Sequence, residues 1–221
     1  MSPRNLVDFL YHEAIGSVDA FEQACIRGLF ETYREADDVN QLIFLPEEQR
    51  FSGPTVRRGM LEKRFAEDIS SLGGQRLADY TARKKDGCQT SHFSRFRIKS
   101  LDFTVSAVAD DTCVPRFAEF RQTRFCAVQA MLSFMDEQLA QDNAQLNVLF
   151  KHGQDQVESS IPQFAIFEVF DADYVSIWKR DLLMEQAAFV ENLLTGRAEV
   201  VPDDEGVPKL RARLLRRRFG S

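Results

Sequence analysis

Two neighbouring segments of the sequence alternate apolar and polar side chains, residue by residue. In residues 93–99, Phe96 and Ile98 alternate with cations, and in residues 101–108 every second side chain is apolar. This alternation is typical of half-buried β-strands. An apolar sheet face must be covered by other elements, so the two segments predict a sheet packed against further layers.

The remaining elements follow from the spacing of apolar residues. Helices are expected where these recur every three or four positions, within the first forty residues and at 55–72, 125–139 and 173–195. Strands are expected at 41–45, 75–82, 116–122, 146–150 and 163–170, and a polar loop at 46–54. Strand runs mixed with single helices predict an α/β or α+β fold, a central mixed β-sheet flanked by helices.

The length of 221 residues favours one large domain with extensions. The changes in composition suggest three parts: an N-terminal helical extension at 1–48, an α/β core domain at 49–202 and a basic C-terminal element at 203–221.

Several classes of protein are excluded by what the sequence lacks. It has no run of eighteen apolar residues, so no membrane span is expected, and its first ten residues do not resemble a signal peptide. The four cysteines form no C-x-x-C pair and, with three scattered histidines, no zinc pattern. Glycine-rich phosphate loops and the G-x-S-x-G elbow are also missing. A reduced, cytoplasmic protein is the simplest expectation.

Charge is distributed unevenly along the chain. The net charge is −6, but residues 49–100 carry +7 between segments of −7 (1–48) and −9 (101–202), and residues 203–221 carry +3. A basic block in an acidic protein suits a phosphate backbone. It can equally neutralise the acidic flanks within the fold or face an acidic partner. On the first interpretation, the residues expected to contact nucleic acid are Lys84, Lys85, Arg95, Arg97 and Lys99.

Two carboxylates on predicted neighbouring strands suggest a metal site. Asp102 lies on the polar side of one strand, and Glu119 lies on the next, two residues before Arg121. If the strands pair, both carboxylates meet on one sheet face, where a cation or a divalent metal must offset their repulsion. Mg²⁺ favours carboxylate oxygen, and Arg121 would then contact the scissile phosphate. The alternative is that both are solvated strand residues, with Glu119 paired to Arg121 or Arg116.

This pattern resembles the PD-(D/E)XK nucleases, the restriction-endonuclease-like family. Their core is a helix, a three-stranded meander, a second helix and a further strand, with an Asp on one meander strand and Glu-x-Lys on the next. Residues 59–65, with Glu62, look like the first helix. Ser100-Leu101-Asp102-Phe103 stands at the Pro-Asp motif, and Glu119-Phe120-Arg121-Gln122 stands at Glu-x-Lys.

The resemblance covers residues 59–150 and implies a restriction-endonuclease-like core with catalytic Glu62, Asp102, Glu119 and Arg121. Mg²⁺ would be held by Asp102 and Glu119. Two departures stand out: Leu101 replaces the motif proline and Arg121 the motif lysine. Arginine stays protonated and cannot act as a base. Glu62 can also be a surface helix residue beside Lys63.

The sequence thus predicts a metal-dependent endonuclease that hydrolyses DNA phosphodiesters, of the kind used in restriction or phage defence. The alternative is a non-catalytic nucleic-acid-binding or protein-interaction subunit of a larger complex. Such a subunit would form a homodimer or bind another protein through its acidic N-terminal helices or its basic C-terminal element.

Overall fold

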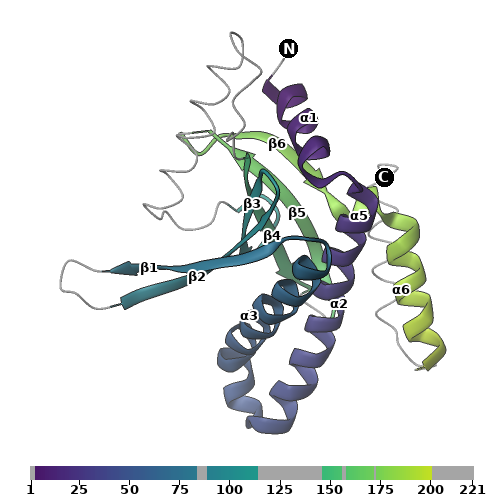
Figure 1. Ribbon diagram of the computed structural model, residues 1–221. Coiled ribbons are helices and arrows are strands. Elements are labelled where there is room, and N and C mark those ends of the chain that lie inside the picture. Colours follow the sequence, from purple (N-terminus) through teal and green to yellow (C-terminus); the bar gives the residue numbers. More distant parts are fainter. Residues whose placement is uncertain (1–2, 84–88, 114–145, 156–157, 172, 201–221) are drawn as a thin grey trace.

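The structure is a computed structural model that describes residues 3–83, 89–113, 146–155, 158–171 and 173–200 (Figure 1). Its helices are α1 (Pro3–Ile15), α2 (Val18–Ile43), α3 (Pro46–Ser71), α5 (Leu182–Glu185) and α6 (Ala187–Val200). Its strands are β1 (Gln75–Arg83), β2 (Gln89–Ile98), β3 (Leu101–Ala107), β4 (Leu146–Gln154), β5 (Pro162–Phe170) and β6 (Ser176–Asp181). None of the helices in these ranges has both the length and the hydrophobicity needed to cross a membrane.

The strands form one mixed sheet in the order β1-β2-β3-β4-β5-β6. β3 and β4 are parallel, and every other neighbouring pair is antiparallel. The predicted α/β fold with a mixed sheet and an N-terminal helical part is confirmed. Parallel neighbours need a crossover connection, which here falls within residues 108–145. The predicted strand at 116–122, the predicted helix at 125–139 and the element at 203–221 lie outside the described residues.

The alternating segments form the β2–β3 hairpin, with Ile98 paired to Leu101 across a two-residue turn. Lys99 takes a φ of 48° in this turn, as tight hairpin turns require. The strands predicted at 75–82, 93–99, 101–108, 146–150 and 163–170 are confirmed as β1 to β5, several of them a few residues longer.

Two predictions near the α2–α3 connection are wrong. Residues 41–45 are not a strand, because α2 continues to Ile43, and the expected loop at 46–54 belongs to α3. Pro46 occupies the first turn of α3, where a missing N–H is tolerated, and Glu48 accepts a hydrogen bond from the backbone N–H of Leu45 at 3.2 Å. Pro54 lies inside the helix without ending it.

The predicted helix at 173–195 is also wrong in its first half, which contains β6. Trp178 faces the helices and is buried, and this antiparallel strand pairs with β5. At the end of β6, Asp181 accepts hydrogen bonds from the backbone N–H groups of Leu183 and Met184, at 3.1 and 3.3 Å. This cap starts the helical part, so the change from strand to helix takes place at one residue.

Helices α1, α2 and α3 cover one side of the sheet, here called the helix face (Figure 1). Phe21 of α2 stacks on Phe167 with ring centroids 5.6 Å apart, and Phe65 of α3 contacts both Phe96 and Phe103. One continuous hydrophobic core thus extends from Val7 to Leu194. The opposite side, here called the far face, is also buried around β3 to β5 and carries Asp102, Leu149, Lys151 and Glu168.

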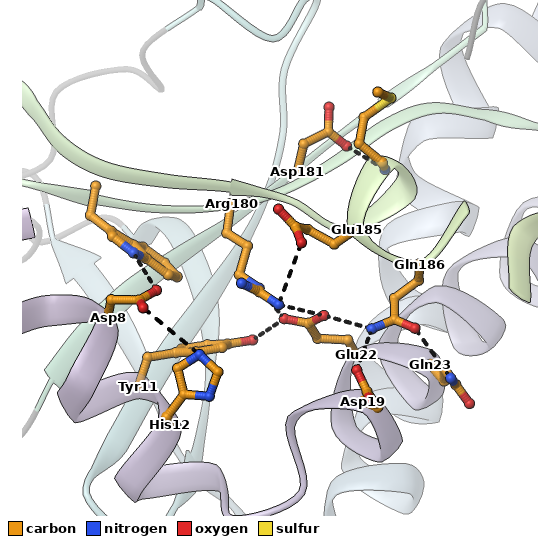
Figure 2. A network of polar contacts seen from close by, with 12 residues as sticks. Asp8, Tyr11, His12, Asp19, Glu22, Gln23, Arg180, Asp181, Glu185 and Gln186 are labelled. Atoms are coloured by element: carbon orange, nitrogen blue, oxygen red, sulfur yellow. Dashed lines mark hydrogen bonds and ion pairs between the residues drawn. The ribbon is translucent and has the colours of Figure 1, made fainter. Parts of the chain in front are cut away.

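A buried polar network fastens the N-terminal helices to β6 (Figure 2). Glu22 of α2 is fully buried and accepts hydrogen bonds from Tyr11 (3.0 Å), Arg180 (2.5 Å) and Gln186 (3.0 Å). Burial and the neighbouring Glu22 carboxylate raise the pKa of Tyr11, so its hydroxyl stays protonated and donates. A buried carboxylate is tolerated when such donors surround it.

Candidate functional site

The carboxylate of Asp102, the centre of the predicted metal site, forms an ion pair with an arginine of the same sheet. It lies opposite Arg97 in the β2–β3 ladder and is 1% exposed. Arg97 donates to both carboxylate oxygens, Nε to Oδ1 at 2.6 Å and Nη2 to Oδ2 at 2.9 Å. The hydrogen bond to Asp102 raises the pKa of Arg97. Both oxygens are therefore engaged by a permanent cation.

The other predicted metal ligand, Glu119, and its neighbour Arg121 lie outside the described residues. Within the described ranges, no three His, Cys, Asp or Glu side chains gather in a way that would hold a metal ion. At Asp102, β3 is paired with β2 on one side and with β4 on the other, so the expected pairing of this strand with one that carries Glu119 is wrong. The Mg²⁺ site stays a prediction that requires Glu119 to approach Asp102 from outside the sheet.

Glu62 points at the sheet from α3, on the side opposite Asp102. Its carboxylate accepts hydrogen bonds from Arg58 Nε at 2.9 Å and from Ser94 Oγ at 2.8 Å. Ser94 and Arg97 lie three residues apart on β2 and so point to opposite faces. The structure therefore does not bring Glu62 and Asp102 together.

The predicted nucleic-acid contacts are also separated. Lys84 and Lys85 lie outside the described residues. Arg95 and Arg97 lie on the far face, where the Arg95 Nε atom is 4.0 Å from Asp102 Oδ2. Lys99 leaves the alternation of β2, because its left-handed turn directs the ammonium group toward Gly16.

Part of the basic block neutralises the acidic N-terminal segment within the fold. Arg64 of α3 forms ion pairs with Glu31 and with Glu35 of α2, the latter at 2.6 Å. Since Arg97 is also paired, the block carries less available charge than its sequence indicates.

A cleft of about 600 Å³ opens on the helix face, where α2 and α3 meet the carboxyl ends of β3 and β4. The carboxyl ends of parallel strands are frequent ligand sites in α/β sheets. Arginines 57 and 58 and Glu62 line it from α3, Tyr33 lines it from α2, and residues 105–109 and 152–154 line it from the sheet.

His152 and Tyr33 form a buried pair at one wall of this cleft. Tyr33 Oη and His152 Nδ1 are 2.8 Å apart. Burial, with Arg57 nearby, lowers the pKa of His152 to about 3, and burial raises the pKa of Tyr33 to about 12. Tyr33 therefore donates to a neutral imidazole, which places the remaining ring proton on Nε2. The described residues offer Nε2 no hydrogen-bond partner.

Arg57 differs from Arg58 in having no ion pair with the described residues. Its guanidinium lies 4.9 Å from the centre of the Tyr33 ring and donates to Gln154 Oε1. Its buried Nε atom has no hydrogen-bond partner, and among the described residues no carboxylate pairs with it.

From the cleft, a line of hydrogen bonds continues to the β1–β2 hairpin. Arg58 donates to Glu62, Ser94 donates to Glu62, and the Nη2 atom of Arg76 donates to Ser94 at 2.9 Å. Three arginines, residues 57, 58 and 76, thus lie along this line with the carboxylate of Glu62. We call residues 57, 58, 62, 76 and 94 the arginine line.

None of the residues predicted for function from the sequence, apart from Glu62, lies at this cleft. The strand predicted at 146–150 stopped before His152, whereas β4 continues through this residue and buries it. Tyr33 was indistinguishable from the apolar stripe of its helix. One signal was available: Arg57 and Arg58 lie one helical turn before Leu61 and Glu62, at the start of a buried stripe.

Comparisons of the chain with protein-family models, with curated proteins and with solved structures find no match. The function of the chain is therefore inferred from the chemistry and geometry of its own residues.

Proposed function

We propose that this protein binds nucleic acid through the phosphate backbone, along the arginine line and the cleft, without needing a metal ion. The observation that carries the proposal is Arg57. It is a partly buried guanidinium that lines a cleft, has no carboxylate partner among the described residues, and lies beside an imidazole N–H and next to Arg58. Guanidinium groups bind phosphate with two parallel hydrogen bonds.

The position of the arginine line in the chain supports the proposal. It belongs to the basic block of residues 49–100, and it runs from α3 onto β2 and β1. Its one acidic member, Glu62, pairs with Arg58. A backbone lying along it would meet cations on neighbouring elements, which suits an extended polyanion.

The test is fluorescence anisotropy with labelled single-stranded and duplex DNA and with RNA, titrated over salt concentration. The variant R57A/R58A should weaken binding at least about tenfold, since hydrogen bonds to charged groups contribute about 1.5–3 kcal/mol. It should also lower the slope of log K against log salt by about two.

The matched control is Arg50→Ala, which removes an exposed arginine of the same helix that contacts Phe51. It should leave both affinity and slope near those of the unchanged protein. Equal losses in the two variants would mean that net charge, and not the cleft, determines binding.

Metal-dependent DNA cleavage is the second candidate function, favoured by the order of elements. Helix α3, the antiparallel meander β1-β2-β3 and the parallel strand β4 share the element order of the PD-(D/E)XK core, but Asp102 lies on the last meander strand, with no further meander strand to carry Glu119. Against a site built on Asp102 stand its two hydrogen bonds from Arg97 and the placement of Glu62 on the other face.

Cleavage assays with Mg²⁺, Mn²⁺ and EDTA separate the two functions. Metal-dependent cutting that is lost in Glu119→Ala would establish the nuclease. Binding without cutting in any metal, reduced in R57A/R58A, would support the non-catalytic function.

A further inference from the structure

The cleft has the size of a small-molecule site. Its volume of about 600 Å³ falls within the range of pockets that enclose whole ligands, about 300–1,000 Å³. A site that only touched phosphates on the protein surface would not need such a depth. The cleft therefore calls for an explanation beyond the backbone contact proposed above.

Its lining combines two kinds of group. The hydrogen-bond donors are the guanidinium groups of Arg57 and Arg58 and the Nε2–H group of His152. The apolar groups are Leu61 from α3, which is buried, and Val105 and Val108 from the sheet, which are partly exposed. Donors together with apolar side chains suit a ligand that has both an anionic and a flat apolar part.

Hydrogen-bond acceptors complete the lining. The Glu62 carboxylate accepts from Arg58 and Ser94, and the Gln154 amide oxygen accepts from Arg57. An amide also carries donors, so the cleft offers both kinds of group to the edge of a ring.

We propose that the cleft takes one unstacked nucleotide unit of a nucleic acid, with its phosphate at Arg57 and Arg58 and its base against Leu61, Val105 and Val108. This proposal rests on the proposed nucleic-acid binding and specifies it. Recognition of single bases outside a stack requires such a pocket, since a base inside a duplex presents only its edges.

The test is isothermal titration of the full chain with adenosine 5′-monophosphate and thymidine 5′-monophosphate, beside the two nucleosides and inorganic phosphate. At least one monophosphate should bind about tenfold or more tightly than its nucleoside or phosphate alone. The monophosphate gains from both kinds of contact, since its base buries apolar surface against the cleft and its phosphate forms charged hydrogen bonds, whereas the nucleoside and phosphate alone each have only one of them.

A variant that fills the cleft without removing charge sharpens the test. Ala107 lines the cleft and is exposed, so Ala107→Trp should abolish monophosphate binding and leave folding intact. Val175→Trp, at a 57% exposed position outside the cleft, is the matched control and should bind normally. Unchanged circular dichroism and unfolding midpoints confirm that both variants are folded.

The outcomes separate the two proposals. Monophosphate binding that A107W removes and V175W keeps supports the nucleotide site. Oligonucleotide binding without monophosphate binding overturns the nucleotide site and leaves the proposed function standing. Monophosphate binding that persists in A107W also overturns it, because the ligand then lies elsewhere. If neither oligonucleotide nor monophosphate binds, both proposals fail.

Discussion

Charged side chains at the centre of the far face and at the cleft are paired differently. On the far face, Asp102 is held by Arg97, and Lys151 lies 2.5 Å from Glu168, with Lys151, Glu168 and Asp102 all buried. At the cleft, on the helix face, Arg57 has no ion pair with the described residues. Elsewhere on the helix face Arg180 is paired with Glu22, so the contrast is between the far face and the cleft. Position in the fold, and not residue type, determines which cations can recognise a partner.

The largest effect that would test this comparison is expected at Lys151. Its Nζ atom lies 3.0 and 3.2 Å from the carbonyl oxygens of Asp111 and Cys113, besides its contact with Glu168. Lys151→Met leaves a buried carboxylate without its cation and should lower the free energy of unfolding by about 3–5 kcal/mol, measured by urea denaturation.

The double variant K151M/E168L removes both charges, and it should be much more stable than Lys151→Met alone. If the single variant were as stable as the unchanged chain, the far face could not be the closed, charge-paired side described above.

A smaller effect is expected at Asp102, which is either the ion-pair partner of Arg97 or a metal ligand. The two roles predict different changes in the free energy of unfolding for Asp102→Asn. If Asp102 is the partner of Arg97, the substitution should lower this free energy by about 1.5–3 kcal/mol without metal, because a charged hydrogen-bonded pair is lost. As one of two repelling metal ligands, the same change should leave the metal-free protein equally or more stable. Chemical denaturation in EDTA decides, with the exposed Asp173→Asn as control.

The last expected effect, about 2 kcal/mol between pH 6.5 and 5, is a pH dependence that comes from the cleft wall. His152 has a pKa of about 3 in the folded protein against an ordinary 6.5, so below pH 6.5 the unfolded chain binds a proton that the folded chain does not. Stability should therefore be complete above pH 6.5 and fall by about 1.4 kcal/mol per pH unit as the pH decreases toward 3.

Urea denaturation between pH 7.5 and 5 measures this slope before most carboxylates titrate. His152→Gln should remove the contribution, whereas His12→Gln, at an exposed position of α1, should leave it unchanged. An identical slope in both variants would show that His152 is not held neutral.

Much of the sheet could be predicted from the sequence, because period-two alternation is visible wherever one face is more polar than the other. The alternation is clear in β2 and β3, and both strands were predicted. β6 was missed because its six residues lie directly before a capped helix, and the apolar positions of strand and helix together imitate a helical stripe. The start of α3 was missed because Pro46 and Pro54 look like loop residues, although a proline suits the first turn of a helix.

The site was less predictable than the fold, for a physical reason. The Asp102–Arg97 pair depends on cross-strand register, because a shift of one strand by one residue would put the two side chains on opposite faces of the sheet. The Tyr33–His152 contact joins residues 119 positions apart, so no pattern within a short stretch of sequence predicts it. Single residues such as Asp102 and Glu62 could be identified as chemically interesting, but whether they meet depends on which face each one occupies.

The Glu22–Arg180 pair has a consequence for how the protein is made. The two residues are 158 positions apart, so a ribosome adding about 5–20 residues per second makes Glu22 about 8–30 s before Arg180 exists. During this interval the Glu22 carboxylate lacks its cation, and for most of it Phe21 lacks Phe167, the ring on which it stacks. Nascent chains stalled before Arg180 should therefore be protease-sensitive and bind chaperones in their N-terminal third, and release of the last strand should end both.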